Sequence, residues 1–389
     1  MSTPGANIVV SKITVDEFLK MKEEWNSLLH ESGSDTVFLT WEWLTSWWKA
    51  YGTGKELCIL KAHRDGKTVG MAPFYRKKIS RFGIQLYALA FLGDGSADSD
   101  YLDLISIKGE EEGVVSGVFD YLSRAASYWD ILLLNEMPET SPHLWFVRDI
   151  LTEKEWFLEK TDVPCVYLHL PSDWETYLKT LKPRMRTKIR SLTNKLEKDF
   201  DVTFNKCNYG EELRPCLESL FNLHNRRWND EGKKGVFLSE AKHHFYWEMS
   251  PLFLTEGWLR LYSLAVNGQY VAHQFCFEYN NTSFLLQEGY DPEWTEYGVG
   301  NVLRGYVFRD CIERSVAIYD FLGGVTQHKL SWGGSVKNSI RMTAGFRSIR
   351  NAYVFGLARG IELGKSRIKK VLPERMLGKA SEIMRRVVR

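Results

Sequence analysis

The sequence predicts an α/β protein in which one unit, a mixed and mostly antiparallel sheet flanked by helices, occurs twice in tandem. The chain has 389 residues, enough for two domains of about 100–200 residues each. Both halves also carry the same order of expected elements, namely a hairpin, a third strand, a helix and an apolar strand. We therefore expect two copies of one α/β unit.

The first copy follows two helical segments near the N-terminus, the second of which is rich in tryptophan. Four tryptophans within eight residues cannot all face one core, and we expect Trp41 to line a groove. A hairpin is predicted around Asp65-Gly66, because both residues tolerate positive φ. The other elements of this copy are a strand at 85–92, a helix at 110–128, an apolar strand at 129–134 and a strand at 165–170 that closes the first sheet.

The second copy begins with a hairpin around Asn267-Gly268, the strongest short turn signal in the chain. A second turn, Asn280-Asn281, leads into a third strand, so that a three-strand meander is expected. A loop with Gly298 and Gly300 follows. The predicted elements are strands at 259–266, 270–279 and 283–288, a helix at 301–314 and an apolar strand at 316–322.

The glycine loop lies at the start of a predicted helix, where the first N–H groups have no intrahelical acceptor and the helix dipole favours an anion. Phosphate or pyrophosphate is the natural ligand, although a Gly-x-Gly pattern is often only a turn and a helix start. The position of the loop directly after a meander favours the phosphate interpretation. We expect the backbone from Gly298 through Val299 and Gly300 to Asn301 to bind it.

This arrangement resembles the core of the GNAT acyltransferase superfamily, in which the loop after the fourth strand cradles the pyrophosphate of coenzyme A. The superfamily pattern is Arg/Gln-x-x-Gly-x-Gly/Ala; the two glycines match, but Thr295 stands at the leading position. More closely, the chain resembles the cellulose-biosynthesis acetyltransferase-like (CelD-like) branch, which is related to the FemAB transferases. This likeness rests on ordered segments: FLTWEWLTSWW (38–48), GMAP (70–73), FLG with DYLD (91–103), HNRRW (224–228) and DFLGG with HK and WGG (320–334).

The resemblance implies a direct acyl transfer with acetyl-CoA or another acyl-CoA as co-substrate. It places Leu286 and Gln287 of the third strand along the pantetheine arm, which a strand backbone can bind through hydrogen bonds. In FemAB-like relatives the C-terminal region borders the substrate channel. Residues expected to bind the sugar or amine acceptor are Trp41, Asp100, Arg227, Trp228 and Trp332.

Direct transfer to an amine requires a group that takes a proton, because a lysine-like amine has a pKa of about 10.4. Candidates near the expected thioester are His273, Glu288, Asp320 and His328. His273 could equally be a satisfied core histidine, Glu288 the partner of a basic residue, and Asp320 a cap of the following glycine turn. We favour Asp320 and Lys329 as catalytic residues over His273, and keep Glu288 as a candidate.

Several classes of protein are disfavoured. The six cysteines show no C-x-x-C spacing and no metal-ligand spacing stands out, so we expect no metal. The N-terminus lacks a basic region followed by an apolar core, and no apolar run reaches the ~18 residues of a spanning helix. We therefore expect a cytoplasmic protein. The basic segment 182–198 has no interleaved aromatics, which argues against DNA; it is either a solvated linker helix or a site for phosphate or an acidic substrate.

Residues 359–389 form a basic tail. They hold ten Lys/Arg and three Asp/Glu, a net charge of +7; since the whole chain carries +2, the rest carries −5. Such a tail suggests peripheral contact with an anionic membrane at its inner face, or else a solvated terminal helix. We accordingly divide the chain into 1–170, 171–355 with the acyl-CoA-type loop, and the helical tail 356–389.

Three functions fit these features. The leading hypothesis is an acyl-CoA-dependent N- or O-acyltransferase in cell-envelope or exopolysaccharide biosynthesis. The second is a FemAB-like transferase that uses aminoacyl-tRNA, although the extra helical arm of some members is missing. The third is a non-catalytic GNAT-fold partner of a polysaccharide-synthesis complex, which Thr295 and the basic tail would suit.

Overall fold

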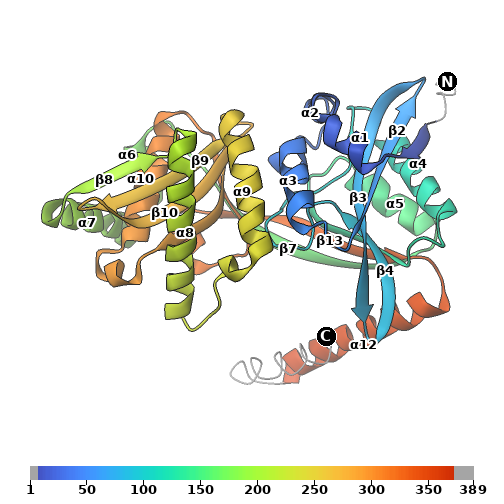
Figure 1. The fold of residues 1–389 in the computed structure, drawn as a ribbon. Coiled ribbons are helices and arrows are strands. Elements are labelled where there is room, and N and C mark those ends of the chain that lie inside the picture. Colours follow the sequence, from blue (N-terminus) through green and yellow to red (C-terminus); the bar gives the residue numbers. More distant parts are fainter. Residues whose placement is uncertain (1–7, 372–389) are drawn as a thin grey trace.

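Strands dominate the architecture. The computed structural model describes residues 8–371, so the end of the predicted tail (372–389) lies outside the described residues. One continuous path of strands runs β1-β2-β3-β4-β6-β13-β7-β12-β11-β10-β9-β8, with β5 paired to β3. Neighbouring strands are antiparallel except β4 with β6 and β11 with β12. The predicted α/β class, with two lobes of mostly antiparallel sheet flanked by helices, is confirmed (Figure 1).

The first lobe, blue to green in Figure 1, is built around a long hairpin. Asp65 and Gly66 turn the hairpin with φ of 50° and 76°, as the sequence predicts. The elements are β1 (Val9–Lys12), α1 (Val15–Lys20), α2 (Lys22–His30), η1 (Val37–Leu39), α3 (Trp41–Tyr51), β2 (Glu56–Arg64), β3 (Lys67–Arg81), β4 (Ile84–Phe91), β5 (Ile105–Ser106), α4 (Glu111–Arg124), β6 (Ile131–Pro138) and α5 (Leu144–Glu153).

The second lobe repeats the hairpin, with Asn267 and Gly268 at φ of 50° and 79°. The elements of the rest of the chain are β7 (Phe157–His169), α6 (Trp174–Thr180), α7 (Pro183–Asp199), β8 (Val202–Lys206), α8 (Gly210–Asp230), η2 (Val236–Leu238), α9 (Glu240–Thr255), β9 (Leu259–Val266), β10 (Gln269–Tyr279), β11 (Thr282–Tyr290), η3 (Pro292–Tyr297), α10 (Val299–Glu313), β12 (Ile318–Gly323), α11 (Gln327–Ser331), β13 (Ser335–Gly345) and α12 (Ile349–Val371).

The internal repeat is visible in the pairing. In the first lobe β4 is followed by α4 and by the parallel neighbour β6; in the second lobe β11 is followed by α10 and by the parallel neighbour β12. A parallel pair requires such a crossover helix. Each lobe therefore contains one pair of parallel neighbouring strands that are joined through a helix, β4 and β6 through α4 and β11 and β12 through α10.

The two lobes share a seam that the sequence did not predict. Strand β13 comes after the second lobe in the chain, yet it lies between β6 of the first lobe and β7. Strand β7 pairs with β13 and β12, so it does not close the first sheet beside β6, as the sequence analysis expected. Figure 1 shows both long strands crossing between the lobes. The seam makes the sheet continuous.

A second contact between the lobes is made by helices α3 and α9. Trp43 of α3 is fully buried and packs edge-on against Phe245 of α9 and against Phe277 of β10, with ring centroids 5.0 and 5.6 Å apart. Lys242 of α9 forms a buried ion pair with Asp98, with an Nζ–Oδ1 distance of 2.5 Å. Large aromatic burial of this kind contributes several kcal/mol, roughly 3–5 for one Trp, so the lobes are held as a unit.

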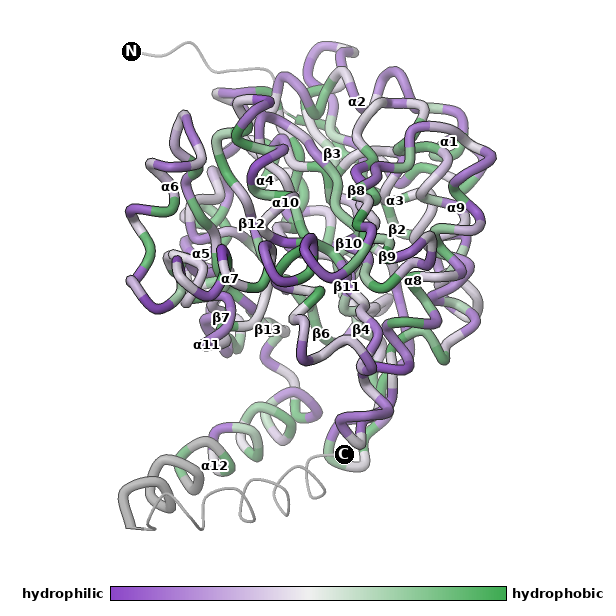
Figure 2. Tube along the Cα trace, turned by 90° about the vertical axis from the view of Figure 1, so that its left-hand side faces the viewer, coloured by the Kyte–Doolittle hydropathy of each residue, from purple (hydrophilic) through white to green (hydrophobic). Residues whose placement is uncertain are grey.

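Hydrophobic residues concentrate on the central strands, and the last described helix, α12, stands at the edge of the molecule (Figure 2). One side of α12 packs on β4 and β7 through Val354 and Phe355. Within the described residues, no helix combines the length and apolar character needed to cross a bilayer.

Candidate functional site

The second lobe places its parallel pair next to the glycine loop. Strands β11 and β12 pair only at Thr282–Phe284 with Ile318–Asp320. Beyond these residues the two strands diverge, and among the described residues no strand pairs with 285–290 on that side. The predicted donor-site residue Leu286 is an extra residue at the bulge of β11, because Phe275 faces Gln287 and Cys276 faces Leu285. The opening and the bulge therefore coincide.

Helix α10 starts at this opening. Gly298 caps it in the left-handed conformation, φ 59°, without a side-chain cap. The Gly298 N–H donates to the Thr295 carbonyl and the Asn301 N–H to the Gly298 carbonyl, which leaves the N–H groups of Val299 and Gly300 without a backbone acceptor in the described structure. The glycines also have a packing reason. A Cβ on Gly298 would lie 2.7 Å from Leu192, and one on Gly300 would lie 3.2 Å from Tyr290. At this loop the backbone packs closely against Leu192 and Tyr290, and N–H groups at the start of α10 have no backbone acceptor. Such N–H groups at a helix start can bind an anion.

A charged cluster lies beside the start of α10. Arg304 is only 1% exposed and donates to the Glu288 carboxylate of β11 and to His328 of α11, the latter at 3.0 Å. Arg227 of α8 lies 3.4 Å from the other Glu288 oxygen. His328 Nε2 is 3.2 Å from Oδ1 of Asn301, which links the cluster to the first turn of α10.

These contacts decide the charges of the cluster. Burial would raise the pKa of the Glu288 carboxyl, but Arg304 and Arg227 outweigh it and hold that pKa at about 2. Burial and Arg304 lower the pKa of His328 to about 4. At neutral pH Glu288 is therefore a carboxylate and His328 a neutral imidazole. A carboxylate with a pKa of about 2 is a poor proton acceptor.

A second charged cluster lies at the far end of β12. Asp320 is fully buried, and its oxygens accept hydrogen bonds from the Tyr101 hydroxyl at 3.0 Å, from Lys337 Nζ at 2.7 Å and from the Leu322 amide at 2.8 Å. Lys329 Nζ donates to the carbonyls of Phe321 and Gly323 at 2.8 and 2.7 Å. The Asp320 carboxylate is thus satisfied by three donors.

Asp100 lies in the same cluster, and the pKa of its carboxyl is raised. Burial, together with the neighbouring Glu136 and Asp320, raises the pKa of its carboxyl to about 7, against the lowering effects of the Gly323 amide and Lys329. Burial lowers the pKa of the Lys329 ammonium. A carboxyl that changes charge near pH 7 is suited to general acid–base chemistry. In the described residues no group of His, Cys, Asp or Glu could hold a metal ion.

Backbone strain accompanies this second cluster. Tyr101, Glu136 and Leu322 all adopt positive φ, at 52°, 62° and 59°. Such conformations cost on the order of 1–3 kcal/mol each and concentrate at functional sites. The turn at Leu322 has a visible consequence, because it directs the carbonyls of Phe321 and Gly323 onto one ammonium, that of Lys329.

The remaining predicted residues are more dispersed. His273 is buried between Ser263 and Ser219, each 2.9 Å from a ring nitrogen, and burial lowers its pKa to about 4. Trp41 packs against the first-lobe core and donates its indole N–H to the Phe18 carbonyl.

Two predicted tryptophans lie near the charged cluster. Trp332 is fully buried under it, with Arg304 5.6 Å above its ring. Trp228 lies beside Arg227, 5.5 Å from the guanidinium. Its buried indole N–H has no hydrogen-bond partner in the described part of the chain.

The structure therefore gathers most of the predicted site into two linked clusters, which we call the Glu288 cluster and the Asp320 cluster. The first contains Glu288, Arg227, His328, Trp332 and the start of α10; the second contains Asp320, Asp100 and Lys329. Sequence reasoning missed Arg304, Tyr101, Glu136 and Lys337. The one signal for Arg304 is its position as a charged residue one turn after Gly300, on a helix whose other inward positions are apolar.

Comparisons with known proteins bear on the fold that carries these clusters. Residues 183–330 match the family model of an acetyltransferase (GNAT) domain. No curated protein is similar enough in sequence to count as a relative. Solved structures similar in fold include FemX, with 11% identity and a TM-score of 0.61 over 88% of this chain and 99% of that one.

Two further structures concern lysylphosphatidylglycerol synthesis. The C-terminal domain of a putative lysylphosphatidylglycerol synthetase from Agrobacterium fabrum has 8% identity and a TM-score of 0.52 over 90% of this chain and 97% of that one. The structure of L-PGS from Bacillus licheniformis has 11% identity and a TM-score of 0.51 over 88% and 95%. At these identities the likeness to the solved structures concerns the fold alone.

The Glu288–Arg304 pair predicts a specific pH dependence of stability. The pKa of Glu288 is depressed to about 2 from an ordinary value of 4.5, so its contribution is complete above about pH 5 and is lost as the pH falls towards 2. After allowance for partial exposure we expect about 2 kcal/mol. In urea unfolding, the free energy of unfolding of Glu288→Gln should fall by about 1 kcal/mol less than that of the unmodified protein between about pH 6 and about pH 3, because part of the contribution is lost only below about pH 3.

The matched control is Glu293→Gln, since Glu293 is exposed and pairs with Arg226 at the surface. That variant should keep the pH dependence of the unmodified protein. Equal pH dependence in Glu288→Gln and the unmodified protein would show that the Arg304 contact does not control the charge of Glu288.

Proposed function

We propose that this protein is an acyltransferase that takes an acyl group from an acyl-CoA and passes it directly to an amine or hydroxyl of a cell-envelope or exopolysaccharide precursor. The observation that carries the proposal is the divergence of β11 from β12 beside the start of α10. A strand edge free of a neighbour offers backbone donors and acceptors to an amide-bearing chain such as pantetheine.

The residues around the opening suit coenzyme A. The free N–H groups at the start of α10 and the nearby Arg227 and Lys188 offer positive charge to a pyrophosphate. Leu286 and Gln287 at the bulge of β11 would bind the arm, and the Gly298–Asn301 backbone would bind the phosphates. When bound, the acyl-CoA supplies an activated thioester. The residues of the chain supply position, proton transfer and charge.

Asp100 is our candidate for the general base. Its carboxyl has a pKa of about 7 and would take the proton of an acceptor amine or hydroxyl as the new bond to the acyl carbon forms, while the thioester C–S bond breaks and coenzyme A leaves as the thiolate. Lys329, held by two backbone carbonyls, is placed to stabilise negative charge on the acyl oxygen. Asp320 and Glu288, which the sequence analysis considered as bases, are assigned to positioning, because Asp320 is saturated with donors and Glu288 is a weak base.

The finer assignments are part of the same proposal. We keep the CelD-like branch, and with it a role in polysaccharide biosynthesis, as the most specific hypothesis. Arg227 and Trp228 border the Glu288 cluster and would contact the acceptor, whereas His273 serves packing. The proposal also keeps the division into 1–170, 171–355 and 356–389, with β13 as the strand that ties the first two regions, and a cytoplasmic site of action.

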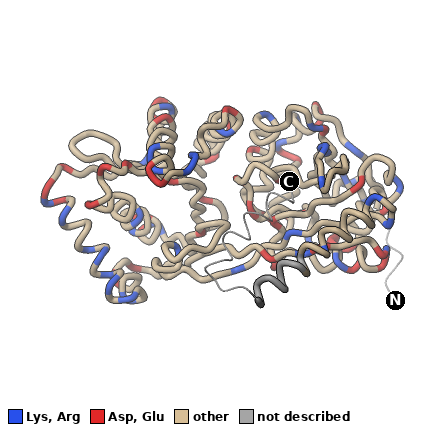
Figure 3. The backbone as a smooth tube through the Cα atoms, turned by 90° about the horizontal axis from the view of Figure 1, so that it is seen from below, with Lys and Arg blue, Asp and Glu red and all other residues tan. Residues whose placement is uncertain are grey.

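Aminoacyl transfer is the second candidate, and one observation favours it. Helix α7 packs against α10 and carries Arg184, Lys188 and Lys195 on the face that approaches the glycine loop, where Lys195 lies 4.3 Å above the Tyr297 ring. Figure 3 shows Lys and Arg along the left-hand edge, where α7 runs. A basic stripe that extends a phosphate site could follow a longer polyanion such as the end of an aminoacyl-tRNA.

Calorimetric titration tests the donor site. Acetyl-CoA should bind, and Asn301→Asp should weaken binding by about tenfold or more, because it adds a negative charge at the helix start without adding volume. Gly300→Glu should have a larger effect, since it also fills the space before Tyr290.

Gly210→Glu is the matched control, because Gly210 begins another helix, α8, and a Cβ there meets no neighbour. This variant should bind acetyl-CoA as the unmodified protein does. If Asn301→Asp and Gly300→Glu also bind unchanged, the glycine loop is not the donor site; if only an aminoacyl-tRNA binds, the second candidate replaces the first.

Asp100 predicts the pH profile of the reaction. Because a base must be deprotonated to act, the rate of transfer should rise with pH through an apparent pKa of about 7. Asp100→Asn should lower kcat by roughly 100-fold or more and remove this rise. Asp94→Asn, on the same loop but held by Asn135 and Lys77, should keep both the rate and the profile. A full rate in Asp100→Asn would transfer the role of base to another group.

A further inference from the structure

Helix α12 presents an apolar stripe that nothing in the described structure covers. One face packs on the sheet through Val354, Phe355 and Ala358. On another face Ile349, Tyr353 and Leu357 follow one another at intervals of four residues and are 91%, 49% and 38% exposed. Residues at this spacing lie on one side of a helix. The stripe is therefore exposed on the side of α12 opposite the buried face, and Figure 2 shows α12 at the edge of the molecule.

The neighbourhood of the stripe is open. A Cβ added at Gly356 or Gly360 would meet no atom within 4 Å. Leu363, one turn further along, is 58% exposed. A face with this much exposed apolar surface and no packing partner is typical of an interaction surface rather than of an ordinary solvated helix.

The positive charge of the C-terminal segment indicates which partner the apolar stripe of α12 would bind. The sequence from Arg359 to Arg389, which includes the second half of α12, carries a net charge of +7. A second copy of the chain would bring two such segments together and is disfavoured by repulsion. An apolar stripe that is followed in the sequence by a basic segment suits a bilayer with anionic phospholipids. The stripe would contact the acyl chains, and the basic residues would contact the anionic headgroups.

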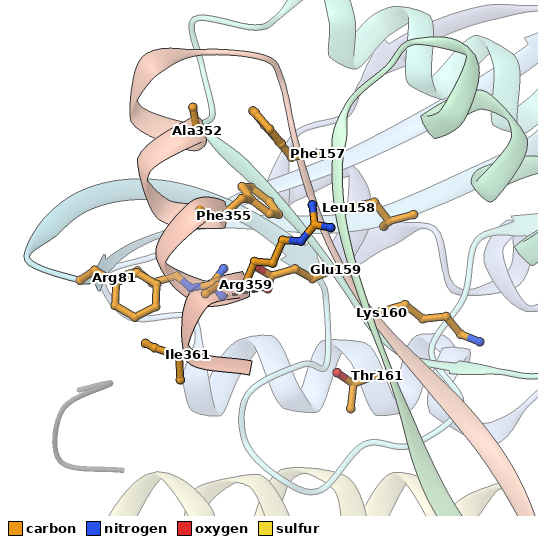
Figure 4. Close-up of a pocket in the computed structure, with 13 residues that line it drawn as sticks. Arg81, Phe157, Leu158, Glu159, Lys160, Thr161, Ala352, Phe355, Arg359 and Ile361 are labelled. Atoms are coloured by element: carbon orange, nitrogen blue, oxygen red, sulfur yellow. Dashed lines mark hydrogen bonds and ion pairs between the residues drawn. The ribbon is translucent and has the colours of Figure 1, made fainter. Parts of the chain in front are cut away.

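A cavity along the same helix supports this assignment (Figure 4). It has a volume of about 490 Å³ and lies between α12, β7 and the end of β3. Phe157 and Phe355 line it and stack with centroids 5.3 Å apart. The charged residues that line it are Arg81, Glu159, Lys160 and Arg359; Arg81 pairs with Glu159 at 2.8 Å and Lys160 with Asp162 at 3.1 Å, so Arg359 is the lining cation without an ion pair among the described residues. An apolar lining with cationic groups suits a phosphate-bearing amphiphile better than a neutral one.

We propose that α12 docks on an anionic phospholipid surface, with Ile349, Tyr353 and Leu357 inserted between the lipids and the cavity beside Arg359 receiving a phosphate headgroup. Docking of this kind lays the helix in the plane of the interface and does not require it to span the bilayer. It is independent of the transfer chemistry. It would bring the opening between β11 and β12 to substrates that are held at a membrane.

Co-sedimentation with vesicles tests the proposal. The full chain should bind vesicles of phosphatidylcholine mixed with phosphatidylglycerol, should bind pure phosphatidylcholine vesicles at least tenfold more weakly, and should be released by added salt. The triple variant Ile349→Ser, Tyr353→Ser, Leu357→Ser should bind the anionic vesicles about tenfold or more weakly. Arg359→Glu should weaken binding to anionic vesicles only.

The matched control replaces two apolar residues that are exposed elsewhere, Trp145 and Leu238 at 65% and 63%, by Ser. It should bind as the unmodified protein does, and circular dichroism should show that all variants are folded. Three outcomes would overturn the proposal: no binding to anionic vesicles, equal binding by the triple variant, or a dimer in solution that the triple variant dissociates. The last outcome would assign the stripe to a second copy of the chain.

Discussion

The structure depends most on the short parallel contact between β11 and β12. Only three residue pairs join these strands. Strand β12 pairs with β7 on its other side over the same residues, and after Asp320 its register with β7 shifts before Gly323 pairs with Cys165. Two sets of hydrogen bonds stabilise the backbone turn at Leu322. The Leu322 amide donates to the Asp320 carboxylate, and the Lys329 ammonium donates to the carbonyls of Phe321 and Gly323. These charged contacts hold the strands apart at the point where α10 begins, and the proposed donor site exists because of that separation.

Both clusters place charges where hydrophobic packing would be more stable. Burying an ion pair such as Glu288–Arg304 costs desolvation that its attraction offsets only when the geometry is good, and removing one partner leaves an uncompensated charge. Three residues of positive φ add strain near Asp320. The aromatic contact of Trp43 across the lobes and the continuous sheet through β13 supply rigid support for these unfavourable features. Such a distribution, with strain at the site and packing around it, is expected of a functional centre.

Much of the fold could be predicted from local signals. The turns at Asp65-Gly66 and Asn267-Gly268, the apolar strands and the repeated order of elements are all properties of neighbouring residues, and the structure contains them. Strand β13 could not be predicted in the same way. Its sequence mixes polar and apolar residues without clear alternation, and its partners β6 and β7 lie about two hundred residues earlier in the chain. A pairing at that separation is decided by tertiary packing.

The candidate site also contains some features that local sequence predicts and others that only the fold determines. The glycine loop was visible as a pattern, whereas the raised pKa of Asp100 arises from burial and from Glu136 and Asp320, which only the fold brings about. Arg304 was missed because a charged residue in a helix is normally exposed, and its burial follows from the contact with Glu288 of a strand that precedes it. The sequence pattern therefore predicts where a ligand would bind, and the fold was needed to find the groups that we propose act on it.

The most direct test of the account is hydrogen exchange of the β11 amides with and without acetyl-CoA. The account predicts that amides between Leu285 and Tyr290 on the side facing the opening become protected, together with those of Val299 and Gly300, while β9 and the first-lobe hairpin stay unchanged. Protection confined to other parts of the chain, with β11 unaffected, would contradict the claim that the opening between β11 and β12 holds the acyl donor.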